Sequence, residues 1–260
     1  AAGYKDVPDW PGVFFHDALK LLLVVYVDDF KLAGPAKNME KGWGLIRKDI
    51  LMGEPEPAGK YLGCMHYFED VTINGPKGPR SARRVVYDME DFLGQCVSRY
   101  LELADDPHLK LRKVNTPFVD ESQDENSVVV QDGSSAPTGR LQPIACRVLM
   151  KLLYAARMAR FDLLRATCAL ATMITKWSPE CDRRLHRLDC YVDSSLKHRQ
   201  VSVVTDRPED LSLELFCDAD FASDKASRRS TSGVYLRLCG PEGSRAGLTG
   251  VSKKQSCIST

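Results

Sequence analysis

The sequence predicts an α+β protein, because strand-like and helix-like periodicities alternate along its 260 residues. Short apolar or alternating runs, such as residues 21–27 and 211–218, are typical of strands. Apolar residues three and four positions apart, as in residues 144–156, are typical of amphipathic helices. With 43% hydrophobic and 27% charged residues, the composition is that of an ordinary soluble globular protein.

The first strand-like run, residues 21–27, carries no charge, which predicts a strand buried on both faces. It ends in Tyr26-Val27-Asp28-Asp29, and a second short apolar run follows, so we expect a hairpin. Adjacent carboxylates repel each other, and holding them beside a packed strand is costly unless a cation is present. Mg²⁺ favours carboxylate and phosphate oxygens. Asp28 and Asp29 are therefore candidate ligands of a two-metal phosphoryl-transfer site; an ordinary solvated turn is the alternative.

The rest of the N-terminal region predicts short elements around this hairpin. Residues 13–15 predict a strand that pairs with the first run. Asn38 is a candidate N-cap for a helix that reaches about Met52. Residues 60–68 predict another strand, and the Gly/Pro turn with a basic tail at residues 74–84 predicts the first domain boundary.

Four helices are predicted in the middle of the chain. Asp88 is expected to cap the first, and Pro143 suits the first turn of the second. Asp162 is expected to cap the third helix, which reaches about Trp177. Ser178, ahead of a proline, opens the fourth.

Charge is distributed unevenly around these helices, although the net charge is only +1. Residues 118–139 are acidic and polar, which predicts a flexible loop. Residues 140–199 hold twelve Lys/Arg against five Asp/Glu, which fits either tracking of a nucleic-acid backbone or a solvated helix face. Residues 200–210 are expected to form a polar link.

A second set of carboxylates follows another strand. Residues 211–218 alternate cleanly, which predicts a half-buried strand that ends in Asp218-Ala219-Asp220. A basic loop with Arg228 and Arg229 comes next, and two further strands are expected at residues 233–239 and 247–260.

Several motifs in this order resemble one family. YVDD after an apolar strand, KYLG, and then DADF, RRSTSG and SKKQ are similar to the copia-type LTR retrotransposon Pol polyprotein. The segment KLLYAARMARFDLLRATCAL is similar to the family's stretch before RNase H. The family usually has Pro where this chain has Phe161 and Trp where it has Phe221. The resemblance covers nearly the whole chain.

The resemblance implies three parts. Residues 1–79 would be the C-terminal half of a reverse transcriptase palm, with antiparallel hairpins and a helix. Residues 80–205 would be a helical thumb and connection that includes the acidic loop, and residues 206–260 would be the opening sheet of an RNase H domain.

The same resemblance implies site residues. Asp28, Asp29 and Asp218 would be catalytic and would bind Mg²⁺ or Mn²⁺, with Asp220 as a further metal candidate. The candidates for contact with nucleic acid are Tyr26, Lys60, Tyr61, Leu62, Gly63, Arg228 and Arg229.

The implied partners are an RNA template, a DNA primer or RNA–DNA hybrid, and the rest of the Pol polyprotein. The family also needs a further palm Asp and an RNase H Glu that match no residue here. We therefore expect this chain alone to catalyse neither DNA synthesis nor RNA cleavage. Two alternatives stay open: a non-catalytic remnant that binds nucleic acid or protein, and a nuclease or phosphatase of another fold that combines Asp28 and Asp29 with Asp218.

The spacing of the cysteines and the hydropathy of the chain predict the compartment in which the protein is found. None of the nine cysteines forms a Cys-x-x-Cys pair, which predicts reduced thiols in the cytoplasm or nucleus. No apolar run approaches the ~18 residues that span a bilayer, and no signal peptide is evident, so no membrane association is expected.

Overall fold

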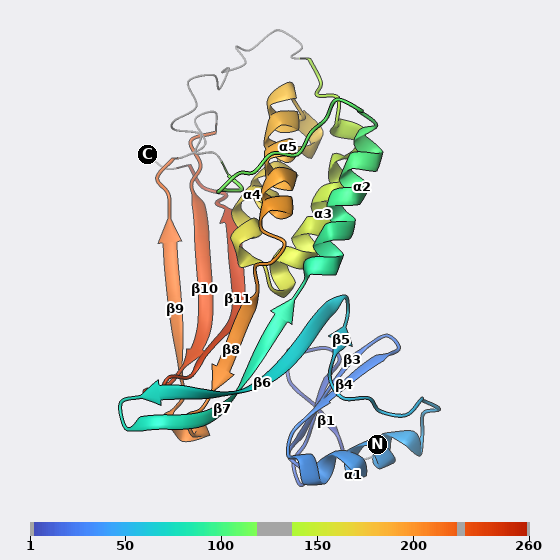
Figure 1. Cartoon of the computed structure of the whole chain (residues 1–260), viewed down its shortest axis with the longest axis vertical. Coiled ribbons are helices and arrows are strands. Elements are labelled where there is room, and N and C mark those ends of the chain that lie inside the picture. Colours follow the sequence, from blue (N-terminus) through green and yellow to red (C-terminus); the bar gives the residue numbers. More distant parts are fainter. Residues whose placement is uncertain (1–2, 119–136, 223–226, 259–260) are drawn as a thin grey trace. The chain divides into compact units, whose positions relative to one another are not determined.

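The computed structural model describes residues 3–118, 137–222 and 227–258. The chain divides into two compact units, Ala1–Gly63 and Cys64–Thr260, drawn in Figure 1. The described residues form two antiparallel sheets of four and seven strands and five α-helices, which confirms the α+β class. Each helix in the described ranges is too short or too polar to cross a membrane.

The first unit is a four-stranded antiparallel sheet with one helix. Its elements are β1 (Lys5–Asp6), β2 (Val13–His16), β3 (Leu21–Tyr26), β4 (Asp29–Ala33) and α1 (Ala36–Arg47). The strands follow chain order across the sheet. Leu21, Leu23 and Leu32 are buried with Ile46 of α1. Gly42 lets the helix come close, because a β-carbon there would collide with Leu21.

Two details of this unit differ from the sequence prediction. β3 is fully buried on one face only, since Leu21 and Leu23 are buried while Leu22 and Val24 are half-buried. Asn38 does not cap α1, because the helix begins at Ala36 and the Asn38 side-chain amide donates to the Leu19 carbonyl at 2.8 Å. The helix also ends at Arg47 rather than near residue 52.

The second sheet has the order β5-β6-β7-β8-β11-β10-β9. Its strands are β5 (Lys60–Tyr61), β6 (Cys64–Gly75), β7 (Gly78–Asp88), β8 (Gln200–Val204), β9 (Ser212–Ala219), β10 (Thr231–Cys239) and β11 (Arg245–Lys254). β8 occupies the stretch that was expected to be a polar link. It pairs with β7 over five residues, and that pairing is a tertiary contact that the local sequence does not indicate.

Residues 74–84 lie inside the long β6–β7 hairpin, and the compact units divide after Gly63 instead. The basic tail continues β7 because acidic residues face it across the pair. Arg84 is opposite Glu69 and Arg83 is opposite Asp70, and both pairs form salt bridges. Cross-strand pairs of opposite charge stabilise a hairpin by roughly 0.2–1 kcal/mol each.

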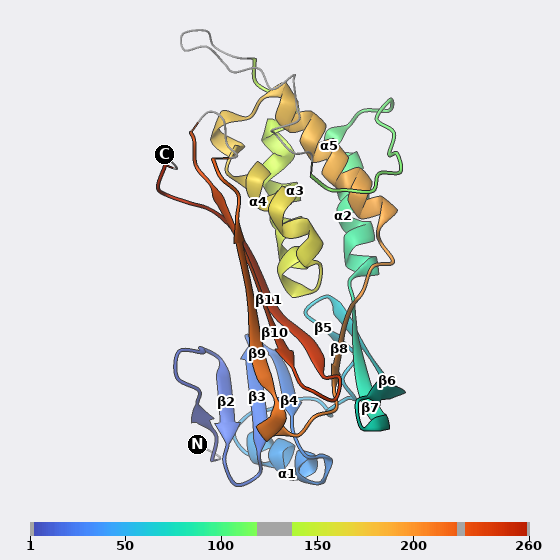
Figure 2. The same ribbon diagram turned by 90° about the vertical axis from the view of Figure 1, so that its left-hand side faces the viewer.

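The helices lie on one side of β11, as the turned view in Figure 2 makes visible. The helices are α2 (Glu90–Ala104), α3 (Gln142–Met158), α4 (Leu164–Ala171) and α5 (Pro179–Ser194), with 3-10 turns η2 (Phe161–Leu163), η3 (Ile174–Lys176) and η4 (Pro208–Asp210). Their apolar stripes form one buried core that includes Leu93, Leu149 and Leu185.

Two predicted helix starts, at Pro143 and Ser178, are confirmed. Pro143 lies in the first turn of α3, and the Ser178 hydroxyl caps α5 by accepting from the Cys181 amide at 3.4 Å. The predicted cap at Asp88 is one residue early, because Met89 is the N-cap of α2. Asp88 ends β7, and its carboxylate accepts from the Glu90 amide at 2.7 Å. α2 buries one face, made up of Leu93, Cys96, Val97, Tyr100 and Ala104.

The predicted cap at Asp162 is wrong. Its carboxylate instead pairs with the buried Arg160 at 2.7 Å and accepts from the Tyr191 hydroxyl at 2.9 Å. Arg160 also donates to the Ser195 carbonyl at 3.0 Å, so this network ties the end of α3 to α5. The expected single helix to Trp177 is broken into η2, α4 and η3.

Asp189 is a polar residue inside the helical core. It is fully buried, and neither carboxylate oxygen has a hydrogen-bond partner among the described residues. Burial raises the pKa of Asp189 well above its usual range, because the low-dielectric interior disfavours the charged form. The folded state therefore favours the neutral acid.

We predict that Asp189→Asn raises the free energy of unfolding at pH 7 by about 1–3 kcal/mol. The wild-type folded state keeps a proton that the unfolded chain releases above about pH 4, so wild-type stability falls as pH rises above that point. Urea unfolding at several pH values measures this slope. Asp193→Asn, an exposed site on the same helix, should change stability little. An unchanged slope in Asp189→Asn would contradict the prediction.

Candidate metal and nucleic-acid sites

The first candidate site is the turn between β3 and β4. Tyr26 pairs directly with Asp29, so Val27 and Asp28 form a two-residue hairpin turn. Val27 has a φ of 55° and is 83% exposed. A β-branched residue rarely adopts positive φ, and glycine is usual at this turn position. Strained backbone of this kind clusters at functional sites and costs about 1–3 kcal/mol.

Both carboxylates at this turn reach solvent. Asp28 and Asp29 are exposed, while the strands beneath them are anchored by Leu23 and Leu32. An ordered β-ribbon therefore holds two adjacent acidic side chains at its end. Across the described ranges, no three His, Cys, Asp or Glu side chains group closely enough to hold a metal ion.

Asp29 also has neighbours that the motif did not predict. Lys31 follows on the same face of β4, and its ammonium lies 5.1 Å from the centre of the Tyr61 ring. Burial, and secondly the charge of Asp29, raise the pKa of Tyr61. The Tyr61 hydroxyl is buried and has no hydrogen-bond partner in the described part of the chain. The sequence alone did not indicate Lys31, because its contact with Tyr61 joins two segments that are separate in the chain.

The KYLG segment forms a second tight turn. Lys60 and Tyr61 make up β5, and Leu62 and Gly63 carry positive φ values of 48° and 78° before β6 begins. Two successive positive φ angles are typical of a type I′ hairpin turn. Lys60 is exposed, whereas Tyr61 and Leu62 are half-buried.

The third candidate lies at the end of β9, in the second unit. Asp218 is exposed, and its carboxylate accepts a hydrogen bond from the adjacent Ala219 amide at 2.8 Å. Asp220 accepts from the Thr231 amide at 2.7 Å and pairs with Arg165 at 3.4 Å. Asp220 therefore links the end of β9 to Thr231 and Arg165, whereas the Asp218 carboxylate bonds only to the adjacent amide in the described contacts. Asp28 and Asp29 belong to the other unit.

Strand β9 itself is more exposed than its pattern predicts. The prediction that this strand is half-buried is wrong, because seven of its eight residues are exposed, among them Leu213 and Leu215 at 62% and 61%. β9 is the edge strand of its sheet, and periodicity alone cannot tell whether anything packs on a face. Arg228 and Arg229, in the following loop, are exposed as expected.

The basic excess of residues 140–199 is largely used inside the fold. Seven of its twelve Lys/Arg side chains make hydrogen bonds or ion pairs, some within one helix and some with distant segments: Arg140, Arg160, Arg165, Arg183, Arg184, Arg187 and Arg199. Arg199, for example, pairs with Asp88 at 2.9 Å. These contacts leave a smaller cationic surface than the sequence suggests.

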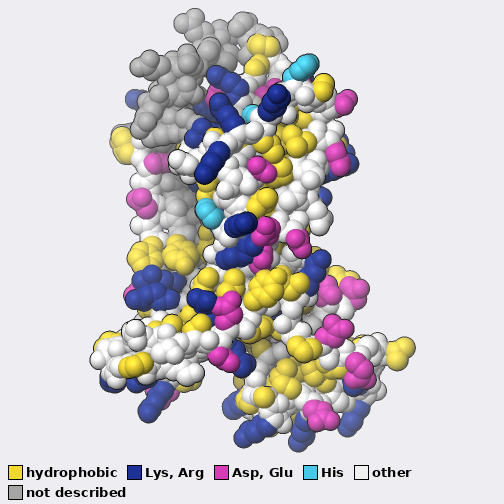
Figure 3. Space-filling model, viewed as in Figure 1, with side chains coloured by type: hydrophobic (Ala, Val, Ile, Leu, Met, Phe, Trp, Pro, Cys, Tyr) yellow, Lys and Arg dark blue, Asp and Glu magenta, His cyan; other side chains and the backbone are white. Residues whose placement is uncertain are grey.

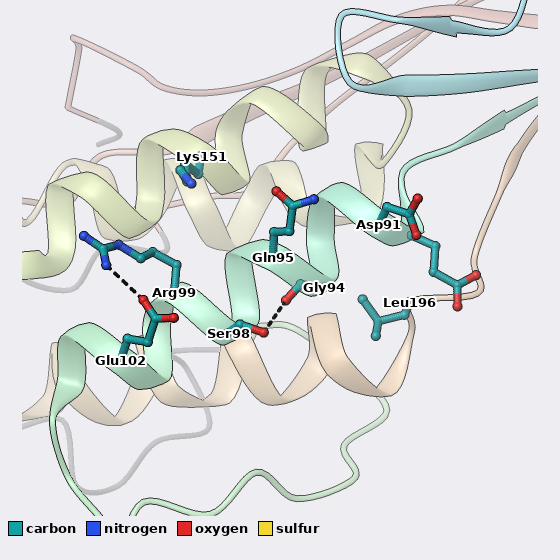
Figure 4. Close-up of a pocket in the computed structure, with 9 residues that line it drawn as sticks. Asp91, Gly94, Gln95, Ser98, Arg99, Glu102, Lys151 and Leu196 are labelled. Carbon is teal, nitrogen blue, oxygen red and sulfur yellow. Dashed lines mark hydrogen bonds and ion pairs between the residues drawn. The ribbon is translucent and has the colours of Figure 1, made fainter.

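A polar hollow lies beside α2 and is lined in part by Lys151 of α3 (Figure 4). Along α2, Arg99 donates to Glu102 at 2.9 Å, and the Ser98 hydroxyl donates to the Gly94 carbonyl at 3.0 Å. Its charges are mixed and partly paired within one helix. No convergent set of ligands is formed there by the residues drawn.

No protein-family model, curated protein or solved structure matches this chain. Its function is therefore inferred from the motifs and the geometry of these sites.

We predict that Val27→Gly raises the free energy of unfolding by about 1 kcal/mol, because glycine relieves the positive φ. Chemical denaturation of the full chain measures the change. Val24→Gly is the matched control, since it lies within β3 and should lower stability by about 0.5–1 kcal/mol or more. If both variants destabilise equally, the turn is not strained.

Proposed function

We propose that this chain is part of a copia-type RNA-directed DNA polymerase with RNase H and that it acts on RNA–DNA hybrids. The observation that carries the proposal is the β3–β4 hairpin. It holds Asp28 and Asp29 side by side at the exposed end of a packed ribbon, next to an exposed Tyr26. This is the arrangement that the YVDD motif implies.

The two carboxylates fit one hydrated divalent cation. Asp28 and Asp29 offer hard oxygen ligands, which suit Mg²⁺ or Mn²⁺ together with waters and a phosphate. Bound metals of this class activate an attacking hydroxyl and stabilise the leaving group. A two-metal cage needs more carboxylates than the described residues bring to this turn.

The chain's own residues would position the nucleic acid. Tyr26 is 59% exposed and directly opposite Asp29, so its ring can stack on a base or sugar beside the carboxylates. Lys60 is an exposed cation at the start of the KYLG hairpin, suited to contact a phosphate. Leu62 and Gly63 fix the shape of that hairpin through their positive φ angles.

In the second unit, Asp218 is the better metal candidate of the two strand-end carboxylates. Asp220 is held by Arg165 and by the Thr231 amide, whereas Asp218 accepts only from its neighbour's amide in the described contacts. Arg228 and Arg229 are exposed cations in the same loop region and suit phosphate contacts.

A non-catalytic remnant that binds nucleic acid is the second candidate. It is favoured by the lack of a third carboxylate near Asp28 and Asp29 within the described ranges. Accordingly, we expect the purified chain not to extend a DNA primer on an RNA template in Mg²⁺ or Mn²⁺. Measurable extension would contradict this expectation and exclude the remnant.

Binding to an RNA–DNA hybrid tests the role of the acidic pair. In chelator, the double variant Asp28→Asn/Asp29→Asn should bind the hybrid about fivefold more tightly than wild type, because two charges that repel phosphate are removed. In Mg²⁺ the order should reverse, since only wild type holds a cation that bridges to the backbone.

The control is Asp6→Asn/Asp9→Asn, which removes two exposed charges from the same unit. The change that this control makes in affinity for the hybrid should have the same sign with and without Mg²⁺. Filter binding across a salt series should also show affinity falling as salt rises. The proposal fails if affinity is independent of salt, or if the two double variants behave alike in Mg²⁺.

A further inference from the structure

The second unit contains a pocket that includes Asp218 and Asp220 and extends beyond these two carboxylates. It has a volume of about 650 Å³ and lies between the η2–α4 segment and strands β9, β10 and β11. This volume is within the range of sites that bind small molecules. Hydrophobic side chains gather over the middle of β9 and β10 on the face shown in Figure 3.

Three aromatic rings form the wall of the pocket. Tyr235 lies 5.9 Å from Phe161 and 6.2 Å from Phe216, measured between ring centres. The guanidinium of Arg237 is 4.9 Å from the centre of the Phe216 ring and holds that ring in place. Phe216 is nevertheless 49% exposed and Tyr235 36% exposed, so ordered aromatic surface remains open. Such surface favours stacking of a flat ring.

Two glycines shape the pocket. A β-carbon at Gly250 would lie 3.0 Å from Leu164 and 3.2 Å from Phe161, so glycine allows the helical segment to approach the sheet. At Gly233, which lines the pocket, a β-carbon would meet only the Asp218 carbonyl at 3.9 Å. A β-carbon at Gly233 therefore meets open space, and a larger side chain there would extend into the pocket that this residue lines.

The charges at the rim select the kind of ligand. Asp218 and Asp220 both line the pocket and accept hydrogen bonds. Arg165 is already engaged, since it pairs with Asp220 at 3.4 Å and lies 4.5 Å from the centre of the Phe118 ring. Without a bound cation, this rim repels phosphate and favours a neutral ring that carries N–H donors.

We propose that this pocket binds a nucleobase with an exocyclic amino group, stacked on Phe216 and Tyr235 with the amino group directed to Asp218. The inference goes beyond the proposed function, because it requires neither a metal ion nor the β3–β4 turn. Cytosine, adenine and guanine carry the amino donor, whereas uracil and thymine do not. The site would thus retain an unpaired base of a single strand.

Titration with nucleosides in chelator tests this proposal, because a nucleoside has no phosphate and chelator removes metal binding. Saturation-transfer NMR on the full chain should give cytidine an affinity at least about tenfold above that of uridine. Tyr235→Leu should weaken cytidine binding about tenfold, the loss typical of one stacking ring. Gly233→Leu should abolish binding while leaving the aromatic rings intact.

Leu213→Ala is the matched control, because Leu213 lies on β9 but is outside the pocket lining. Its affinity for cytidine should equal that of wild type. Equal affinities for cytidine and uridine, or binding that survives Gly233→Leu, would overturn the proposal. Failure here would leave the Mg²⁺-dependent behaviour of Asp28 and Asp29 untouched, so the two proposals fail separately.

Discussion

The constraint on which the proposed function depends is the two-residue turn between β3 and β4. Because Tyr26 and Asp29 pair directly, only Val27 and Asp28 are available to reverse the chain. The turn forces Val27 into positive φ and leaves both carboxylates at the exposed end of the ribbon. A longer loop would relieve the strain but would no longer hold the two acidic residues at the end of the paired strands.

Burial of apolar side chains in the first unit offsets the backbone strain at Val27. Leu21 and Leu23 of β3 pack with Ile46 of α1, and Gly42 permits the close approach of helix and sheet. Burial of each such aliphatic side chain stabilises the fold by about 1.5–3 kcal/mol, which exceeds the cost of one strained residue. The ribbon can therefore hold Asp28 and Asp29 in a fixed relation before any ligand binds, which reduces the ordering that binding would require.

In the second unit, several charged side chains stabilise the fold by forming ion pairs within the chain. Arg160 is buried and bonded to Asp162 and to Ser195, and breaking such a buried pair typically costs about 3–5 kcal/mol. Arg199, which follows α5, likewise pairs with Asp88, which precedes α2. A local excess of basic residues in sequence is thus not the same quantity as a cationic surface, because ion pairs formed in the tertiary structure reduce it.

The sequence predicted those elements whose signals are local. The apolar runs and stripes located β3, α2, α3 and α5. Pro143 in the first turn of α3 and the cap at Ser178 are confirmed. Asn38 and Asp162 have the residue types of caps, but each side chain instead bonds to a distant segment.

Tertiary pairing explains the remaining misses in the fold and in the site. The basic tail of residues 74–84 belongs to β7 and faces acidic residues on β6. β8 lies between β7 and β11 and pairs with both. The YVDD motif predicted the acidic turn, whereas Lys31 near Tyr61 and Arg165 on Asp220 depend on contacts between separate elements.

The most direct test of the central claim is Mn²⁺ titration of the isotope-labelled chain followed by NMR. If Asp28 and Asp29 hold a divalent cation together, paramagnetic broadening should begin at the amides of residues 26–29 and should be displaced by Mg²⁺. It should disappear at these amides in Asp28→Asn/Asp29→Asn. Broadening that spares this turn, or that persists there in the double variant, would contradict the account.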